Sequence, residues 1–171
     1  MLISLGKVWL NPRSVTVALP TFQPVRPVTV NELGGAGAWL PTLENCLIVL
    51  QHPVTNEAEE AAAQLGLTLD MLPKVPTLVF WPGQDAGAEA MSKLLRRYQD
   101  RVHTVRNLPP ERFLRLLTQC RALIGNSSAG IRECSYLGVP VVNIGSRQDG
   151  RERGREPSLW RCLVQARRPG A

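Results

Sequence analysis

Short apolar runs recur along this chain and alternate with segments whose apolar residues have helical spacing. The runs are short enough for strands buried on both faces of a sheet, and they span residues 46–50, 77–81, 102–105, 122–125 and 139–144. The intervening segments predict helices over residues 56–72, 86–98, 109–120 and 128–137. This alternation predicts an α/β fold, a Rossmann-like parallel sheet with flanking helices.

The two ends of the chain depart from this pattern. Residues 1–45 contain repeated prolines and the glycine-rich stretch 34–37, so we expect an irregular segment, with strand-like composition only at 15–19 and 28–30. Residues 155–171 are rich in arginine and also predict an irregular tail. The sequence therefore predicts one folded region over residues 46–154.

A small, hydroxyl-rich turn joins the run at 122–125 to the helix that follows it. Ser127 and Ser128 would stand at the helix N-terminus, where free backbone N–H groups suit a phosphate or diphosphate. Glu133 lies six residues after Ser127, too far along to complete a capping box. The turn therefore predicts a nucleotide-diphosphate site, although a Ser or Asn that merely caps the helix is the common alternative.

Three polar turns follow predicted strands, at residues 51–53, 125–128 and 145–148. The carboxyl ends of parallel strands meet at one edge of a sheet, so these turns should converge and bring His52 and Arg147 to the same site. Taken alone, His52 could be satisfied by backbone groups and Arg147 could form a surface ion pair. Their convergence favours a single ligand site.

Composition predicts a globular protein rather than a membrane or secreted one. With 44% hydrophobic and 20% charged residues the chain resembles an ordinary globular protein, and no apolar run approaches the ~20 residues that span a bilayer. The first ten residues lack the basic region and apolar core of a signal peptide, so we expect a cytoplasmic protein without a membrane partner.

The spacing of the cysteines and histidines argues against a metal site, and the distribution of charge argues against a nucleic-acid partner. The four cysteines form no C-x-x-C pair and the two histidines lie far apart, so we expect free thiols and no metal site. Six arginines and two glutamates in residues 151–171 give +4 of the net +6, which leaves +2 for the other residues. Basicity confined to the tail, with only 5% aromatic residues, disfavours nucleic acid as a partner.

Several motifs in register resemble the C-terminal half of the hydrolysing UDP-N-acetylglucosamine 2-epimerases. The similarity is strongest to the branch that feeds sialic-acid-type sugars, which includes the epimerase domain of the bifunctional epimerase/kinases. It covers residues 46–154, through motifs at Gln51–Thr55, Trp81–Gly87, Gly125–Glu133, Leu137–Asn143 and Gly145–Gly154.

The resemblance implies the second, UDP-binding domain of a GT-B fold. It implies an enzyme that converts UDP-N-acetylglucosamine and water to UDP and N-acetylmannosamine, without a metal or redox cofactor. By position, Ser127 and Ser128 would hold the diphosphate, Glu133 would accept hydrogen bonds from the ribose, and Arg147 would offset the charge of UDP. His52 would line the cleft and is the one candidate here for a catalytic role.

Departures from the family's pattern limit what this chain is expected to do alone. Gly83 stands where the family commonly has Asn, and Asn107 stands where the animal enzymes have His. The family's proton-transferring carboxylates belong to the N-terminal domain, whereas residues 1–45 hold only Glu32 and Glu44. We therefore expect a truncated, inactive half that binds UDP or UDP-N-acetylglucosamine.

Two alternatives stay open at this point. The chain could be a non-catalytic nucleotide-sugar binding module, or the C-terminal subunit of a split epimerase whose N-terminal half is a separate protein. An incompletely covered sheet would expose apolar surface, so self-association into a homo-oligomer is also expected.

Overall fold

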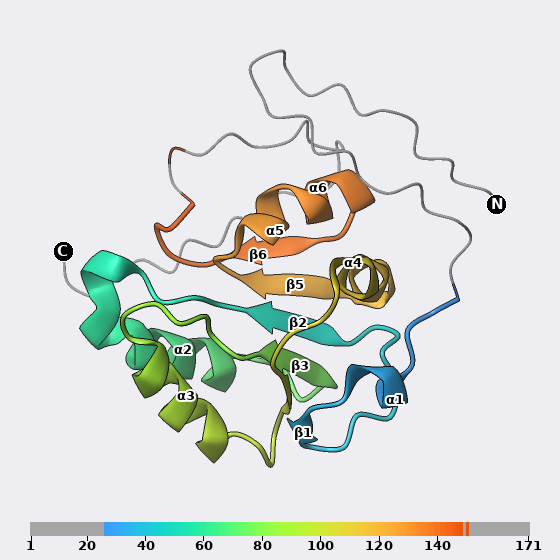
Figure 1. The fold of residues 1–171 in the computed structure, drawn as a ribbon, viewed down its shortest axis with the longest axis horizontal. Helices are drawn as coiled ribbons and strands as arrows, with labels where there is room; N and C mark the ends of the chain where they lie inside the picture. Colours follow the sequence, from blue (N-terminus) through green and yellow to red (C-terminus); the bar gives the residue numbers. More distant parts are fainter. Residues whose placement is uncertain (1–25, 149, 151–171) are drawn as a thin grey trace.

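A computed structural model describes residues 26–148 and residue 150. Its sheet has six strands in the order β1-β4-β3-β2-β5-β6 (Figure 1). The two-residue edge strand β1 runs antiparallel to β4 and all other neighbours are parallel, so the predicted Rossmann-like parallel sheet is confirmed. The strands are β1 (Ala36–Gly37), β2 (Leu47–Leu50), β3 (Thr77–Phe80), β4 (His103–Val105), β5 (Ala122–Gly125) and β6 (Val141–Asn143).

Helices follow β2, β3, β4 and β5, as the alternating pattern predicted. Within the described residues no helix is long and apolar enough to cross a bilayer. The helices are α1 (Val30–Leu33), the 3₁₀ helix η1 (Thr55–Glu60), α2 (Ala61–Asp70), α3 (Ala88–Arg97), α4 (Pro110–Gln119), α5 (Ser128–Ile131) and α6 (Glu133–Leu137).

The sheet is covered on both faces, which explains why its strands are continuous apolar runs. Successive residues of a strand point to opposite faces. Ile48, Leu78 and Leu123 pack with apolar side chains of α1, α4 and α6, whereas Val49 and Val79 pack with α2 and α3. The helices of the second group, α2 and α3, lie together at the lower left of Figure 1. Alternation between two apolar layers therefore leaves Thr77 as the one polar residue of β2, β3 and β5, and its hydroxyl donates to the Val75 carbonyl at 2.9 Å.

Two predicted helices differ from the structure in their continuity. The helix predicted over 56–72 begins instead as the 3₁₀ helix η1, in which Glu57 has non-helical dihedrals (φ −132°, ψ 27°). The helix predicted over 128–137 is divided into α5 and α6 at Arg132 (φ −112°, ψ −76°). Apolar spacing reports which side of a segment is buried, and it does not report a local change in backbone direction.

The segment before β2 contributes structure that the sequence did not predict. The strand expected over residues 28–30 is wrong, because Val30 begins α1, and β1 adds an edge to the sheet. The Gln119 side chain on α4 brackets Val28: its Oε1 accepts from the Val28 N–H at 2.8 Å, and its Nε2 donates to the Val28 carbonyl at 3.2 Å. The expected strand at 15–19 and the tail at 155–171 lie outside the described residues.

Strand order places one topological switch point at the centre of the sheet, and the space outside the strand ends at this point is named the crevice. From β2 the chain proceeds outward to β3 and β4, then returns to the other side of β2 to form β5 and β6. The direction of winding thus reverses between β2 and β5, whose last residues, Leu50 and Gly125, are paired. In open α/β sheets, ligands bind outside the carboxyl ends of the strands at such a reversal.

Candidate functional site

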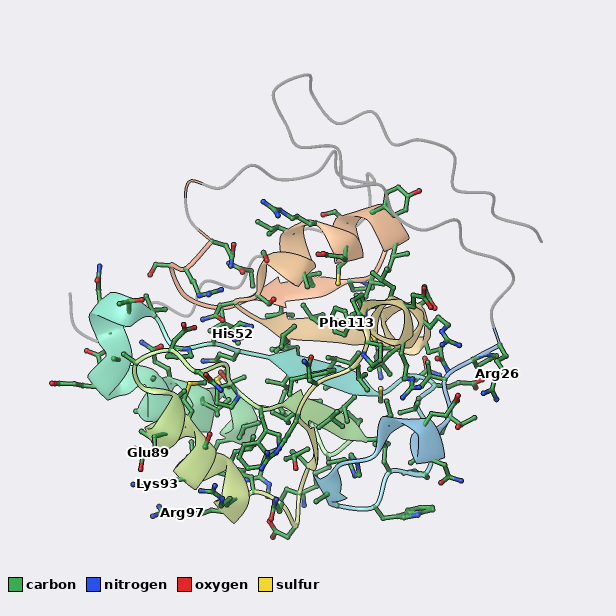
Figure 2. The ribbon with its side chains drawn as sticks, in the orientation of Figure 1. Arg26, His52, Glu89, Lys93, Arg97 and Phe113 are labelled. Atoms are coloured by element: carbon green, nitrogen blue, oxygen red, sulfur yellow. The ribbon has the colours of Figure 1, made fainter. Side chains whose placement is uncertain are left out.

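The turns that follow β2 and β5 are joined by one buried carboxamide. Asn126, only 2% exposed, accepts a hydrogen bond on Oδ1 from the His52 N–H at 2.7 Å. Its Nδ2 donates to the His52 carbonyl at 2.8 Å. Figure 2 shows His52 beyond the end of β2. The central crevice therefore has His52 on one side and the start of α5 on the other.

The turn after β6 reaches the same place. Gln148, which is fully buried, donates from Nε2 to the Asn126 carbonyl at 2.6 Å. Arg147 donates from Nη1 to the same carbonyl at 3.4 Å. The predicted convergence of three turns on one edge is confirmed, whereas the roles of their residues toward a ligand stay predictions.

Both serines of the turn lie at the N-terminus of α5. Ser127 is the N-cap, and its Oγ accepts from the Ala129 N–H at 3.3 Å, so the alternative of an ordinary cap holds for this residue. Its hydroxyl proton remains able to donate elsewhere. Because α5 has only four residues, an anion here would depend on individual N–H and hydroxyl groups and on Arg147 rather than on a long helix dipole.

Glu133 opens α6, behind the serine turn. Its side chain is half-buried, and its buried Oε2 has no hydrogen-bond partner among the residues that the structure describes. Leaving a buried acceptor unpaired costs ~1–3 kcal/mol, and more when it is charged. A hydroxyl donor from a ligand would remove this cost, so the position suits recognition of a sugar.

His52 sits in an environment that favours its neutral form. Burial lowers the pKa of its imidazole, nearby Arg147 lowers it further, and Asp85 opposes both effects. A neutral imidazole offers one donor and one acceptor. His52 can therefore take part in hydrogen bonding or proton transfer at the crevice without adding charge.

The lowered pKa of His52 makes stability depend on pH in a defined direction. Between the native pKa and the ordinary value of 6.5, the unfolded chain binds more protons at this site than the native chain. The free energy of unfolding is therefore expected to fall as pH drops below 6.5, and the loss is complete below the native pKa. Urea titrations from pH 8 to 5 should show this decline reduced in His52→Gln, and an unchanged decline would contradict the assignment.

The described cysteines are not arranged for reaction or metal binding. Burial raises the pKa of the Cys46 thiol to about 11 and that of Cys120 to about 12, and it also raises the pKa of Cys134. These thiols stay protonated near neutral pH and are poor nucleophiles. Within the described residues, no group of three His, Cys, Asp or Glu side chains could hold a metal ion.

A hollow of about 480 Å³ opens elsewhere, at the β4 side of the sheet. Its lining includes Trp81, Arg106 and Arg96, whose guanidinium lies 5.6 Å from the centre of the Trp81 ring. None of the five predicted site residues lines it. The hollow is thus separate from the crevice between β2 and β5.

Two residues of the crevice were missed by sequence reasoning. Asn126 and Gln148 stand inside the motifs at 125–133 and 145–154, but nothing local indicates what their amides contact. Burial of a side-chain amide in a turn is the only signal that could have found them, and it depends on the fold.

Known proteins resemble this chain through the same region. The family model for UDP-N-acetylglucosamine 2-epimerase matches residues 34–158. The UDP-N-acetylglucosamine 2-epimerase of Neisseria meningitidis serogroup B is 37% identical over 116 residues, covering 66% of this chain and 30% of that protein. The hydrolysing UDP-N,N'-diacetylbacillosamine 2-epimerase of Legionella pneumophila is 29% identical over 117 residues, covering 66% and 31%. The chain thus spans about 30% of the length of these relatives.

Solved structures give weaker likenesses. A UDP-N-acetylglucosamine 2-epimerase from Rickettsia bellii aligns with a TM-score of 0.42 and 14% identity, covering 59% of this chain and 27% of that one. AviGT4, a glycosyltransferase involved in avilamycin A biosynthesis, aligns with a TM-score of 0.40 and 20% identity, covering 70% and 36%. The family model spans most of the chain and includes all three turns of the crevice. The chain belongs to the UDP-N-acetylglucosamine 2-epimerase family.

Proposed function

We propose that this chain binds UDP, free or as part of UDP-N-acetylglucosamine, at the crevice between the carboxyl ends of β2 and β5. Ser127 and Ser128 hold the diphosphate through their hydroxyl groups, and Arg147 offsets its charge. Glu133 accepts hydrogen bonds from the ribose hydroxyls. The observation that carries the proposal is the buried Oε2 of Glu133, which has no hydrogen-bond partner among the described residues and belongs to the helix that follows the serine turn.

The charges around the crevice support this orientation of the nucleotide. A guanidinium beside the turn suits a diphosphate, whose paired oxygens match its forked donors. Glu133 is a carboxylate and would repel the diphosphate, so it suits the hydroxyl-bearing ribose instead. His52 is held neutral by burial and by Arg147, and it would donate a hydrogen bond to the diphosphate or to the sugar.

The reaction to which this binding contributes is proposed to be the hydrolytic 2-epimerisation of UDP-N-acetylglucosamine to UDP and N-acetylmannosamine. This chain would supply the UDP-binding half of a GT-B enzyme, with His52 beside the sugar. Removal of the proton at C2 needs an acid/base pair of carboxylates, which the family resemblance assigns to the other half. We therefore expect this chain to bind nucleotide without turnover until that half, or a second polypeptide carrying it, is supplied.

The proposed setting is the cytoplasm, in a route to sialic-acid-type sugars. The described cysteines Cys46, Cys120 and Cys134 are free thiols, which suits a reducing compartment. A homo-oligomer, or a complex with the catalytic half, would complete the cleft.

Isothermal titration with UDP tests the proposed site. Ser128→Ala and Glu133→Ala each remove one proposed contact and are expected to weaken UDP binding about tenfold, or ~1.4 kcal/mol. Glu44→Ala is the matched control, because this exposed glutamate precedes β2 at the opposite edge of the sheet, and it should bind UDP as the wild type does. UDP affinity that is unaffected by both site variants would remove the proposed site.

A further inference from the structure

We infer that Asn126 is a positioning residue, which fixes His52 and Arg147 relative to each other before a ligand arrives. The inference rests on the proposed function, because it concerns the geometry of the same UDP site. Asn126 contacts the turns after β2 and β6 through different atoms, and it belongs itself to the turn after β5. It is thus a residue that connects all three turns.

The carboxamide holds His52 by a reciprocal pair of hydrogen bonds. Oδ1 accepts from the His52 N–H at 2.7 Å while Nδ2 donates to the His52 carbonyl at 2.8 Å. Both backbone groups of His52 are occupied, so the position of its Cα and the direction of its Cα–Cβ bond are restrained. Only a side chain with one donor and one acceptor can make this pair, and Asn does so without charge.

The backbone carbonyl of Asn126 holds the other turn. Gln148 donates to it at 2.6 Å, whereas Arg147 donates at 3.4 Å. The short bond anchors the turn, and the longer one ties the Arg147 guanidinium to the same carbonyl. Because Asn126 and Gln148 are buried, water competes little for these bonds.

The Asn126→Asp variant tests whether the hydrogen bonds of the carboxamide, rather than only its volume, position His52. The carboxylate has nearly the same shape and can still accept from the His52 N–H, but it cannot donate to the His52 carbonyl. It also places negative charge beside His52 and Arg147, where the diphosphate is proposed to bind. We expect this variant to remain folded and to bind UDP at least about tenfold more weakly.

Histidine NMR of the ligand-free protein gives a readout that does not depend on UDP. The chain has two histidines, and His103, on β4, faces the carbonyls of Gly34 and Ala38 and serves as an internal reference. In Asn126→Ala and Asn126→Asp, the ring signals and the titration of His52 should move while the ring signals of His103 stay in place. The control Thr68→Val deletes a different buried hydrogen bond to this turn, the 2.8 Å contact from Thr68 Oγ1 to Gln51 Oε1, and should move neither.

Coupling to His52 is the second readout, because the Asn126 side chain contacts His52 whereas Arg147 contacts the backbone carbonyl that every residue keeps. In the wild-type background Asn126→Ala should weaken UDP binding about tenfold. In a His52→Ala background the same change should cost less than about twofold, because the group that the carboxamide positions is gone. A full additional tenfold loss in that background would show that Asn126 acts otherwise and would overturn the inference.

The outcomes separate this inference from the proposed function. If the wild type does not bind UDP, the proposed function fails, yet a shift of the His52 signals in both variants still supports the positioning role. If the wild type binds UDP and the folded Asn126→Asp variant binds it equally well with unmoved His52 signals, the inference is wrong and the proposed function stands.

Discussion

Replacing Gly125 with alanine is expected to disrupt the centre of the sheet. Gly125 has φ +144°, a conformation that side chains rarely adopt, and an added Cβ would lie 2.1 Å from the carbonyl oxygen of Leu50. That neighbour is backbone of the adjacent strand β2, so it cannot move aside without breaking the pairing of β2 with β5. The combined strain should lower the free energy of unfolding by about 3 kcal/mol or more.

Gly138→Ala is the matched control for this substitution. Gly138 also has a positive φ (+69°), but an added Cβ would meet nothing within 4 Å. Its cost should be limited to the left-handed conformation, ~1–2 kcal/mol. Urea unfolding of the two variants measures the difference, and equal losses would mean that the close approach of β2 and β5 contributes nothing.

Reversing the charge of Arg147 is expected to have the largest effect on UDP binding. Arg147→Glu replaces the cation that faces the proposed diphosphate with a carboxylate, which loses the attraction and adds repulsion. We expect UDP affinity to fall at least ~100-fold, which corresponds to ~2.7 kcal/mol. Arg147→Lys keeps the charge but loses the fork, so an intermediate affinity is expected.

Arg121→Glu controls for the change in net charge. Arg121 is an exposed arginine that precedes β5, so it lies at the amino end of the strand whose carboxyl end borders the crevice. The two reversals change net charge equally, and only the one at Arg147 should abolish tight UDP binding in calorimetry. Comparable losses in both variants would point to general electrostatic attraction rather than to a site.

The strands could be predicted because their environment is uniform. Residues 47–50, 77–80 and 122–125 lie between two apolar layers, so nearly every position favours an apolar residue and the run itself marks the strand. The helices α3 and α4 followed from one apolar face and one charged face. Where backbone direction changes inside one apolar pattern, at Glu57 and Arg132, no comparable signal is present in the residue pattern.

Structure held by distant residues was not predictable in the same way. The segment at residues 26–45 was expected to be irregular because it is broken by Pro and Gly, yet α1 and β1 are held by α4 and β4. The bonds from Gln119 to Val28 join residues 91 positions apart. No local pattern encodes such a contact.

The residues of the candidate site also differ in whether they could be predicted from the sequence. His52, Ser127, Ser128, Glu133 and Arg147 could be proposed because turns after parallel strands must share an edge, and because they fall within recognisable motifs. The role of the Asn126 carboxamide could not be predicted, because its partner is the backbone of His52, 74 residues earlier. Every residue carries the same backbone groups, so such a contact does not determine the residue type of the partner.

Mapping UDP onto the backbone by NMR tests the central claim most directly, because it locates the ligand. Titration of the ¹⁵N-labelled chain with UDP should shift the amides of residues 51–53, 126–130 and 145–148 most strongly, with saturation at a single affinity. Absence of any shift would contradict the proposed binding. Shifts confined to the separate hollow at Trp81, Arg96 and Arg106 would contradict its location between β2 and β5.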